Sequence, residues 1–156
     1  MNAPAGTVVS IHTTATNAAP LGSADIVRAV PGRGLEGDRH FQRQAKPPRK
    51  RGSGSDVTLI EAEAIEALKR DYGIDLPPGD TRRNIVTRGV PLNHLVGREF
   101  LVGSVRLHGA ELCEPCGHLA KLTSEKASRG LVHRGGLRCD VLTEGHIRVG
   151  DAVTVL

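Results

Sequence analysis

The sequence predicts a mainly β domain with a few short helices, an α+β fold in which the strands form a closed or nearly closed β-barrel. Its 156 residues fit one domain over residues 1–156. Nineteen glycines and nine prolines indicate many turns, which suit short strands better than a helical bundle. Strand-like patterns outnumber helical ones and do not alternate with them, so a doubly wound parallel sheet fits poorly. Closure into a barrel would leave no exposed strand edges.

The first half of the chain contains four strand-like patterns and one clear helical pattern. The strands are expected at 7–13, 26–30, 57–60 and 84–87. Ile65, Leu68 and Tyr72 recur at three- and four-residue spacing and predict a helix over 61–72. Gly73 stands where this helix would end, because glycine is the commonest residue just after a helix C-terminus.

The second half is expected to hold shorter elements. These are one helical turn within 90–96, strands at 99–102 and 104–112, and short helices at 118–122 and 125–131. Two further strands, at 137–142 and 146–156, are expected to pair around a turn at Glu144 and Gly145 and to close the fold.

The net charge of +4 is distributed unevenly along the chain. One short part of the chain holds Arg28, Arg33, Arg39, Arg43, Lys46, Arg49, Lys50 and Arg51. Only Glu36 and Asp38 oppose these charges there. The pattern is typical either of a solvated basic loop or of an electropositive rim that attracts an anionic ligand. Residues 41–55 are polar and rich in glycine and proline, so we expect a mobile loop when no ligand is bound.

Composition narrows the classes of function. Three aromatic residues and no tryptophan offer few stacking platforms for single-stranded nucleic acid, so no nucleic-acid partner is expected. No stretch approaches the roughly 20 apolar residues of a membrane helix, and the N-terminus lacks a signal-peptide pattern. We therefore expect a cytoplasmic protein without a membrane partner. The odd number of cysteines, three, argues against a disulfide framework.

Two motifs rich in glycine or arginine are candidate ligand sites. The first ends in Arg39 and His40, and it is either a rigid structural loop or a loop that directs these side chains into a ligand site. The second, residues 81–89, holds Arg82 and Asn84 two positions apart, so both would point the same way on a strand. A guanidinium suits phosphate or carboxylate oxygens, and an amide suits the edge of a heterocycle. The alternative for this motif is a set of surface arginines.

Cys116 is the candidate chemical centre. It follows Pro115 and precedes a glycine and an expected short helix. A thiol at a helix N-terminus near basic groups has a lowered pKa, and its thiolate is both a nucleophile and a soft metal ligand. The spacing of Cys113 and Cys116 also fits a zinc site, which His118, His133 and Cys139 could complete. Structural zinc is disfavoured because no second tight pair follows, and two inert buried cysteines are the remaining alternative.

A further motif surrounds the pair Gly135 and Gly136, where the chain turns into an expected strand. Arg134 and Arg138 lie on either side of this pair and could face an anion. The neighbouring His133 is a lone histidine, which is more often structural than functional. Arg134 and Arg138 are therefore added to the candidate cofactor-binding residues.

In their order along the chain, these motifs resemble those of MOSC domains, the domain type found in the C-terminal part of molybdenum-cofactor sulfurases. The resemblance runs from about residue 27 to residue 153, nearly the whole chain. Any one motif is weak, but their order and spacing together are specific. The motifs are Gly34–Arg39, Val57–Ile60 with the acidic helix after it, Arg82–Val86, Pro115–Cys116, Gly136–Arg138 and Ile147–Asp151.

The resemblance implies a MOSC-type β-barrel with a single reactive cysteine, which Cys116 matches. In the family this cysteine is taken to carry sulfur as a persulfide or to bind the molybdenum of a pterin cofactor. Arg82 and Asn84 match the arginine and asparagine associated with cofactor binding. Two features depart from full sulfurases. We expect a stand-alone barrel without their pyridoxal-phosphate desulfurase domain, and Cys113 has no shared role in the family pattern.

Three functions follow as expectations. The first is binding of the molybdenum cofactor (molybdopterin), an anionic pterin, with Cys116 as a molybdenum ligand; by resemblance, this would support reduction of N-hydroxylated compounds with a redox partner protein. The second is sulfur transfer through a persulfide on Cys116, with a desulfurase as partner. The third, of a different class, is a non-catalytic barrel with a structural zinc site at Cys113 and Cys116. The first two would make the protein a molybdenum-dependent oxidoreductase or a sulfurtransferase-like protein.

Overall fold

Strands dominate the computed structural model, which describes residues 5–17, 19–43, 46–115 and 124–156. The strands are β1 (Ala5–Thr13), β2 (Gly22–Ala24), β3 (Ile26–Val30), β4 (Gly34–Leu35), β5 (Val57–Glu61), β6 (Ile85–Arg88), β7 (Glu99–Val102), β8 (Val105–Leu112), β9 (Leu137–Val141), β10 (Gly145–Arg148) and β11 (Ala152–Val155). The helices are α1 (Ala62–Tyr72), α3 (Glu125–Gly130) and the 3-10 helices η1 (Pro78–Thr81) and η2 (Leu92–Leu95).

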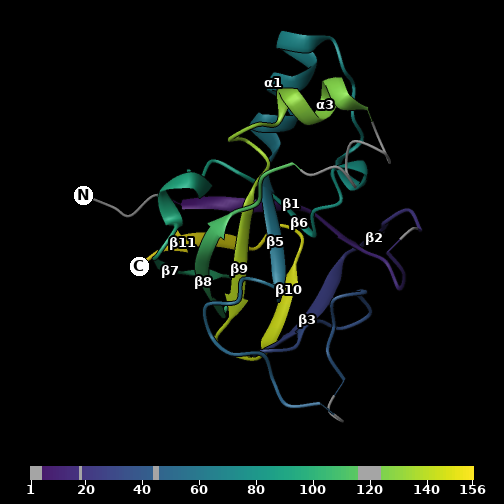
Figure 1. Ribbon diagram of the computed structural model, residues 1–156. Helices are drawn as coiled ribbons and strands as arrows, with labels where there is room; N and C mark the ends of the chain where they lie inside the picture. Colours follow the sequence, from purple (N-terminus) through teal and green to yellow (C-terminus); the bar gives the residue numbers. More distant parts are fainter. Residues whose placement is uncertain (1–4, 18, 44–45, 116–123) are drawn as a thin grey trace.

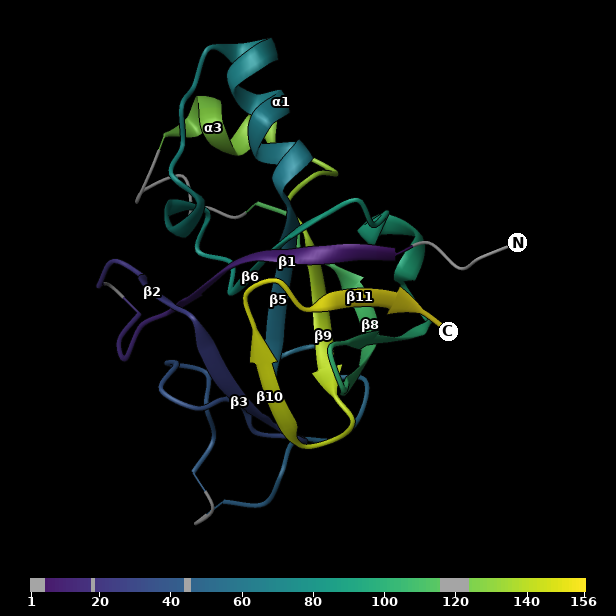
Figure 2. The same cartoon turned by 180° about the vertical axis from the view of Figure 1, so that it is seen from behind.

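Seven of these strands close into a β-barrel, which confirms the expected mainly β fold (Figure 1). The order around the barrel is β1, β11, β7, β8, β9, β5 and β6, and pairing of β1 with β11 closes the ring (Figure 2). Neighbouring strands run antiparallel except β5 and β6, which are parallel. A parallel pair needs a crossover connection, and α1 with η1 supplies it. A small second sheet, in the order β10-β3-β4, flanks the barrel.

The barrel interior is aliphatic, as the scarcity of aromatic residues requires. Its largest fully buried side chains include Ile11, Leu35, Leu59, Ile85, Leu92, Leu95, Phe100 and Leu107. Burial of each such side chain stabilises the fold by about 1.5–3 kcal/mol. Alternation along each strand sends the intervening residues outward, so the outer wall of the barrel is where polar side chains collect.

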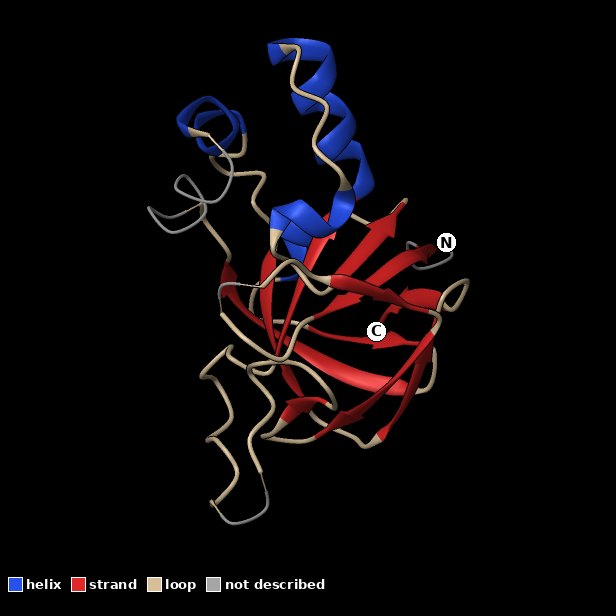
Figure 3. Ribbon diagram, turned by 90° about the vertical axis from the view of Figure 1, so that its right-hand side faces the viewer, coloured by secondary structure: helices blue, strands red, loops and turns tan. Residues whose placement is uncertain are grey.

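The two α-helices stand together at one end of the barrel (Figure 3). The predicted helix over 61–72 is confirmed as α1, and Gly73 ends it in the left-handed conformation with φ of 69°. Ser124 caps α3 by accepting a hydrogen bond from the Ala127 N–H at 3.0 Å. A second apolar cluster, which includes Leu68 of α1 and Leu131 beside α3, joins the helices to the barrel.

Residues 41–55 form a basic loop on the outside of the barrel. Two buried carboxylates fix the later part of this loop to the barrel wall. Asp140 of β9 accepts hydrogen bonds from the N–H groups of Gly52 and Gly54, both at 2.8 Å. Asp56 accepts from the Val141 N–H at 3.0 Å and pairs with Arg49 at 2.9 Å. The mobility expected for residues 41–55 stays a prediction, and these contacts are made by Arg49, Gly52 and Gly54 within that range.

The expected closing pair of strands is wrong. The chain at 146–156 is not one strand, because it bends at Gly150, where φ is 92°, and the Asp151 side chain accepts the Arg148 N–H at 2.8 Å. β10 therefore pairs with β3 in the small sheet, whereas β11 pairs with β1 and β7 in the barrel. The helix expected at 118–122 lies outside the described residues. Among the helices that the structure describes, none has the length and apolar character needed to cross a membrane.

Candidate functional site

Four basic side chains from distant parts of the sequence come together around His40 near the outer wall formed by β5 and β9, and Arg82 adjoins them through Arg39. This basic cluster consists of Arg39, His40, Arg49, Arg82 and Arg138. Arg39 donates from Nη2 to the Arg82 carbonyl oxygen at 3.4 Å, and the Arg49 guanidinium donates to the His40 carbonyl oxygen. Arg39, Arg49 and Arg138 each lower the pKa of His40. Four of the five, all except Arg49, are residues that the sequence motifs selected.

The local backbone explains how Arg39 and His40 reach this wall. The chain turns at Gly34 and Gly37, both with positive φ, after β3. The buried Asp38 then holds the turn by accepting the Thr14 N–H at 3.2 Å and the His40 N–H at 3.3 Å. The side chains that follow Asp38, those of Arg39 and His40, are thereby directed to the outside of the barrel.

The alternation of side chains along β9 determines the direction in which Arg138 points. Its neighbours Leu137 and Cys139 point into the core, so Arg138 points outward from β9, opposite Thr58 on β5. Gly54 of the basic loop lies directly against it, since a Cβ on that glycine would lie 3.1 Å from the Arg138 Cβ. The loop therefore forms one border of the basic cluster.

The electrostatics of the basic cluster favour an anion. Burial, and then the charge of Arg39, lower the pKa of both His40 and Arg82. Two buried N–H-bearing atoms, Nη1 of Arg39 and Nε of Arg82, have no hydrogen-bond partner among the described residues, although Nη1 lies 3.7 Å from Asp38. Buried donors are normally satisfied, and an anionic oxygen would satisfy these while reducing repulsion between the guanidinium groups.

Acidification is expected to destabilise the ligand-free protein through His40. Because burial and Arg39 lower its folded-state pKa below 6.5, the unfolded chain takes up a proton first as the pH falls through that value. The group has no effect above this pH, and the loss of stability grows below it until the folded-state pKa is reached. Urea unfolding at about pH 7.5 and about pH 5.5 should show a smaller decrease for His40→Gln than for the wild type. An equal decrease would contradict the assignment.

Arg82 does not lie on a strand, which corrects the expectation from alternation. It ends η1 with φ of 66°, and β6 begins only at Ile85. Its guanidinium donates to the carbonyl oxygens of Ala19 at 2.5 Å and Asn17 at 2.6 Å. Cys116 lies outside the described residues, so whether Arg82 and Asn84 face it stays a prediction.

Asn84 joins three strands of the barrel. Its Oδ1 accepts from the Thr58 N–H at 3.1 Å and the Thr58 hydroxyl at 3.2 Å, and its Nδ2 donates to the His12 carbonyl oxygen at 3.1 Å. The side chain is buried, with 2% of its surface exposed. These contacts give Asn84 a structural role at the junction of β1, β5 and β6, and its role as a cofactor ligand stays a prediction.

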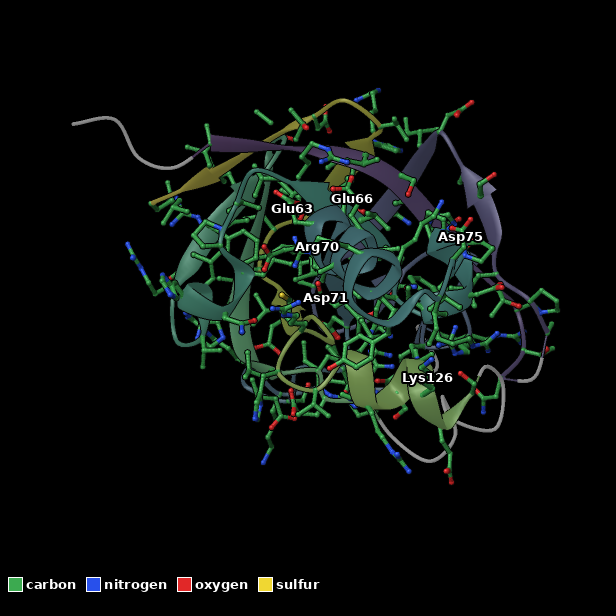
Figure 4. The ribbon with its side chains drawn as sticks, turned by 90° about the horizontal axis from the view of Figure 1, so that it is seen from above. Glu63, Glu66, Arg70, Asp71, Asp75 and Lys126 are labelled. Atoms are coloured by element: carbon green, nitrogen blue, oxygen red, sulfur yellow. The ribbon has the colours of Figure 1, made fainter. Side chains whose placement is uncertain are left out.

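Arg134 lies apart from the basic cluster, at the helical end of the barrel. Its guanidinium pairs with Asp71 of α1 at 3.5 Å, and Figure 4 shows Asp71 on α1 beside Arg70. Here Arg134 lines a cavity of about 290 Å³ together with Glu61, Glu63, Ala64, Ala67 and Arg70. Burial, and then Glu63, raise the pKa of Glu61 in this cavity. Arg134 and Arg138 are thus separated, although only four positions divide them in sequence.

The two cysteines that the structure describes are both buried. Cys113 directly follows β8, and 3% of its surface is exposed. Cys139 lies in the barrel core, where burial raises the pKa of its thiol well above the ordinary value. Cys116 and His118 lie outside the described residues. Within residues 5–17, 19–43, 46–115 and 124–156, no group of His, Cys, Asp and Glu side chains could hold a metal ion. His133 is exposed and its ring pairs with Glu114 at 3.2 Å.

Sequence motifs did not single out Arg49 or the carboxylates that position its loop. Arg49 was one of eight basic residues in the same part of the chain, and nothing in that run separates it from its neighbours. Asp140 stands between Cys139 and Val141 in an apolar strand, which is a signal that could have identified it as buried and hydrogen-bonded, whereas Asp56 only precedes such a strand.

The fold is a small closed β-barrel with a cluster of basic side chains near its outer wall, and comparison with known proteins identifies its family. The model of the MOSC domain matches residues 38–154, and the chain belongs to the MOSC domain family. MOSC domains are associated in general with the molybdenum cofactor and with sulfur chemistry. No curated protein matches the sequence.

Solved structures share the fold at low sequence identity. The YuaD protein of Bacillus subtilis has a TM-score of 0.79 and 16% identity, and the match covers 96% of this chain and 94% of that one. YiiM of Geobacillus stearothermophilus has a TM-score of 0.72 and 14% identity, with 97% and 75% covered. YiiM of Escherichia coli has a TM-score of 0.63 and 17% identity, with 100% and 70% covered. At these identities the likeness establishes the fold.

Proposed function

We propose that this protein binds the molybdenum cofactor against the outer wall of β5 and β9, where the basic cluster holds the anionic part of the pterin. The observation that carries the proposal is the gathering of like charges at a partly buried place, where two donors have no partner within the part of the chain that the structure describes. A protein does not gain stability from placing guanidinium groups together in this way, so the arrangement is best explained by an anionic ligand.

The residues of the basic cluster would contribute to anion binding in different ways. Arg39 and Arg82 are largely buried and held by Asp38 and by loop carbonyl groups, so they form a preorganised base for phosphate oxygens. Arg138 is more exposed and only loosely paired with Glu111 at 3.8 Å, so it is free to close over a bound anion. A bound anion would raise the pKa of His40, because a neighbouring negative charge favours the protonated imidazole.

Cys116 would complete the site as the sulfur ligand of molybdenum, as the family resemblance implies. The bound cofactor would supply the redox or oxo-transfer chemistry, for which N-hydroxylated compounds are the proposed substrates, with a redox protein as electron donor. The second candidate function uses the same cysteine as a persulfide carrier loaded by a desulfurase. It draws on the association of the family with sulfur chemistry.

The proposal is tested by measuring which metal, sulfur and pterin groups are bound to the protein when it is purified from a host that makes the cofactor. Molybdenum, zinc and sulfane sulfur should be measured together with the fluorescent pterin released by oxidation. Molybdenum with pterin supports cofactor binding, sulfane sulfur alone supports the carrier function, and zinc alone supports the non-catalytic barrel. Absence of pterin and of molybdenum in protein from such a host overturns the leading proposal.

Arg138→Gln is expected to lower loading, and Arg134→Gln provides a matched control. The two side chains are similarly exposed, 41% and 49%, and flank the same glycine pair, but only Arg138 belongs to the basic cluster. Loss of one charge-assisted hydrogen bond should weaken cofactor binding by about tenfold or more. Equal pterin content in both variants, or a larger loss in Arg134→Gln, would contradict the placement of the site.

A further inference from the structure

Asp56 is a buried carboxylate just before β5, and its two oxygens have different partners. Oδ2 accepts the Val141 N–H at 3.0 Å and the Gly32 N–H at 3.1 Å, which joins β9 to the turn after β3. The other oxygen, Oδ1, accepts from Nη1 of Arg49 at 2.9 Å. Asp56 is 2% exposed, so its charge has to be offset by partners of this kind. The carboxylate therefore links the barrel wall to one arginine of the basic cluster.

Arg49 in turn joins the basic loop to the segment from Gly32 to His40. Its Nη1 also donates to the Arg33 carbonyl oxygen at 3.2 Å, and its Nη2 donates to the His40 carbonyl oxygen. Together with the Asp56 contact, the side chain uses three of the five N–H donors of a guanidinium, which leaves donors for a further acceptor. Arg49 is thus held against the turn with part of its guanidinium available to an anion.

The charges around Arg49 favour moving its side chain away from this place. Arg39, Arg49 and Arg138 all act on His40, so the three guanidinium groups lie near the same imidazole. Like charges at short range repel, and a long side chain on a loop can relieve the repulsion by turning to solvent. The Arg49 side chain is nevertheless only 22% exposed. The buried carboxylate of Asp56 is a negative partner that offsets the repulsion.

We infer that Asp56 is a positioning residue for anion binding, because it holds the guanidinium of Arg49 at the basic cluster. The inference rests on the proposed function in one respect, that the basic cluster binds an anion. A carboxylate beside a cationic site ordinarily weakens anion binding by repelling the ligand. Asp56 is expected to do the opposite, since loss of Arg49 from the cluster costs more than repulsion from one carboxylate that is already paired. The sign of its effect therefore separates positioning from simple charge.

The test measures the affinity for inorganic phosphate by isothermal titration calorimetry at constant ionic strength, with the full chain free of cofactor. Asp56→Asn keeps an amide oxygen for the Val141 and Gly32 N–H groups but presents an amide N–H to Arg49, so the ion pair is lost. We expect phosphate to bind about three- to tenfold more weakly. Removal of one negative charge would by itself make phosphate bind more tightly, so an unchanged or stronger affinity overturns the inference.

Asp140→Asn is the matched control. Asp140 is also 2% exposed, and it also holds the basic loop, through the Gly52 and Gly54 N–H groups rather than through a guanidinium. Both variants lose one buried negative charge and should unfold at lower urea concentrations than the wild type. Asp140→Asn should weaken phosphate binding far less than Asp56→Asn. Equal losses would show that Asp56 acts on the loop as a whole and not on Arg49, and the inference would be wrong.

Two further variants test whether Asp56 acts through Arg49. Arg49→Gln should weaken phosphate binding by a similar factor, and the double variant Asp56→Asn with Arg49→Gln should bind phosphate about as weakly as either single variant. If the two losses multiply in the double variant, Asp56 acts independently of Arg49 and the inference fails. If Asp56→Asn does not fold, Asp56→Glu is measured in its place. It keeps the charge but displaces the carboxylate, so weaker phosphate binding supports the inference and unchanged binding contradicts it.

The pKa of His40 provides a second readout, which does not depend on a bound ligand. Burial lowers it most, Asp38 raises it, and three charges lower it further, those of Arg39, Arg49 and Arg138. Release of Arg49 in Asp56→Asn should therefore raise the pKa of His40 toward its ordinary value, whereas loss of a carboxylate by charge alone would lower it. Titration of the histidine ring signals by NMR, assigned with His40→Gln, measures the change. A lower or unchanged pKa of His40 argues against release of Arg49 and rejects the inference.

Failure of this inference and failure of the proposed function are distinguishable. Pterin and molybdenum in the wild type, together with undiminished phosphate binding in Asp56→Asn, reject only the positioning role. No pterin in the wild type, together with weaker phosphate binding and a raised pKa of His40 in Asp56→Asn, rejects only cofactor binding. A wild type that does not bind phosphate at all overturns the inference.

Discussion

Cys116→Ser is expected to abolish loading with cofactor or with sulfur, whereas Cys113→Ser should retain most of it. A serine hydroxyl is neither a soft metal ligand nor a sulfur nucleophile, so the substitution removes the chemistry. Cys116 has the setting of a reactive thiol in the sequence, after Pro115 and before Gly117. The Cys113 carbonyl oxygen accepts a hydrogen bond from Arg83, and the Cys113 side chain is buried.

Two measurements check this difference. Molybdenum and sulfane sulfur contents should fall to background in Cys116→Ser alone, and a limiting alkylating reagent at neutral pH should label Cys116 faster than Cys113 in the wild type. Unfolding of each variant should be recorded, because a hydroxyl buried at Cys113 has a cost of its own. Equal labelling together with equal loss of loading in the two variants would point to a metal site shared by both cysteines.

Asn84→Ala is expected to destabilise the protein by about 2–4 kcal/mol. The substitution removes hydrogen bonds to Thr58 and His12 and leaves the partly buried N–H of Thr58 and the buried carbonyl of His12 without these partners. These groups belong to β5 and β1, which both pair with β6, so the loss falls at the place where the parallel and antiparallel parts of the barrel meet. Urea unfolding gives the change in free energy.

Asn93→Ala is the matched control, because Asn93 also donates to a carbonyl oxygen, that of His133, but does so at the surface. Its cost should be at most about 0.5 kcal/mol. Similar unfolding free energies for the two variants would contradict the structural role of Asn84. A loss of cofactor loading in Asn84→Ala without a loss of stability would instead support the ligand role that the family resemblance implies.

Local patterns in the sequence were sufficient for most of the elements and for the family. The spacing of Ile65, Leu68 and Tyr72 with Gly73 predicted α1, because helical periodicity and a left-handed residue after the helix are features of the local sequence. Of these three side chains, Leu68 is buried and Tyr72 is exposed. The glycine-rich turns and short apolar runs predicted the barrel in the same way. Ordered motifs predicted the MOSC family, since each motif depends on residue type and spacing alone.

The grouping of the candidate site residues depended on contacts that local patterns do not contain. Arg82 and Asn84 were expected to share a face, but the chain leaves η1 in a left-handed conformation at Arg82, so alternation begins only after it. Arg134 and Arg138 have similar positions in the sequence, on either side of the same glycine pair. The turn at Gly135 and Gly136 sends one toward α1 and the other to the outer wall of β9.

Residue types and the spacing of apolar residues along the chain thus predicted the fold class, helix α1 and four of the five residues of the basic cluster. Tertiary structure alone decided that 146–156 divides between two sheets, that Arg49 joins Arg39 and His40, and that Arg83 binds the carbonyl oxygens of Cys113 and Gly135. The physical reason is the range of the interactions. Helix and strand patterns act over a few residues, whereas hydrogen bonds of buried arginines and carboxylates join backbone groups that can be 50 or more positions apart, as Arg83 and Gly135 are.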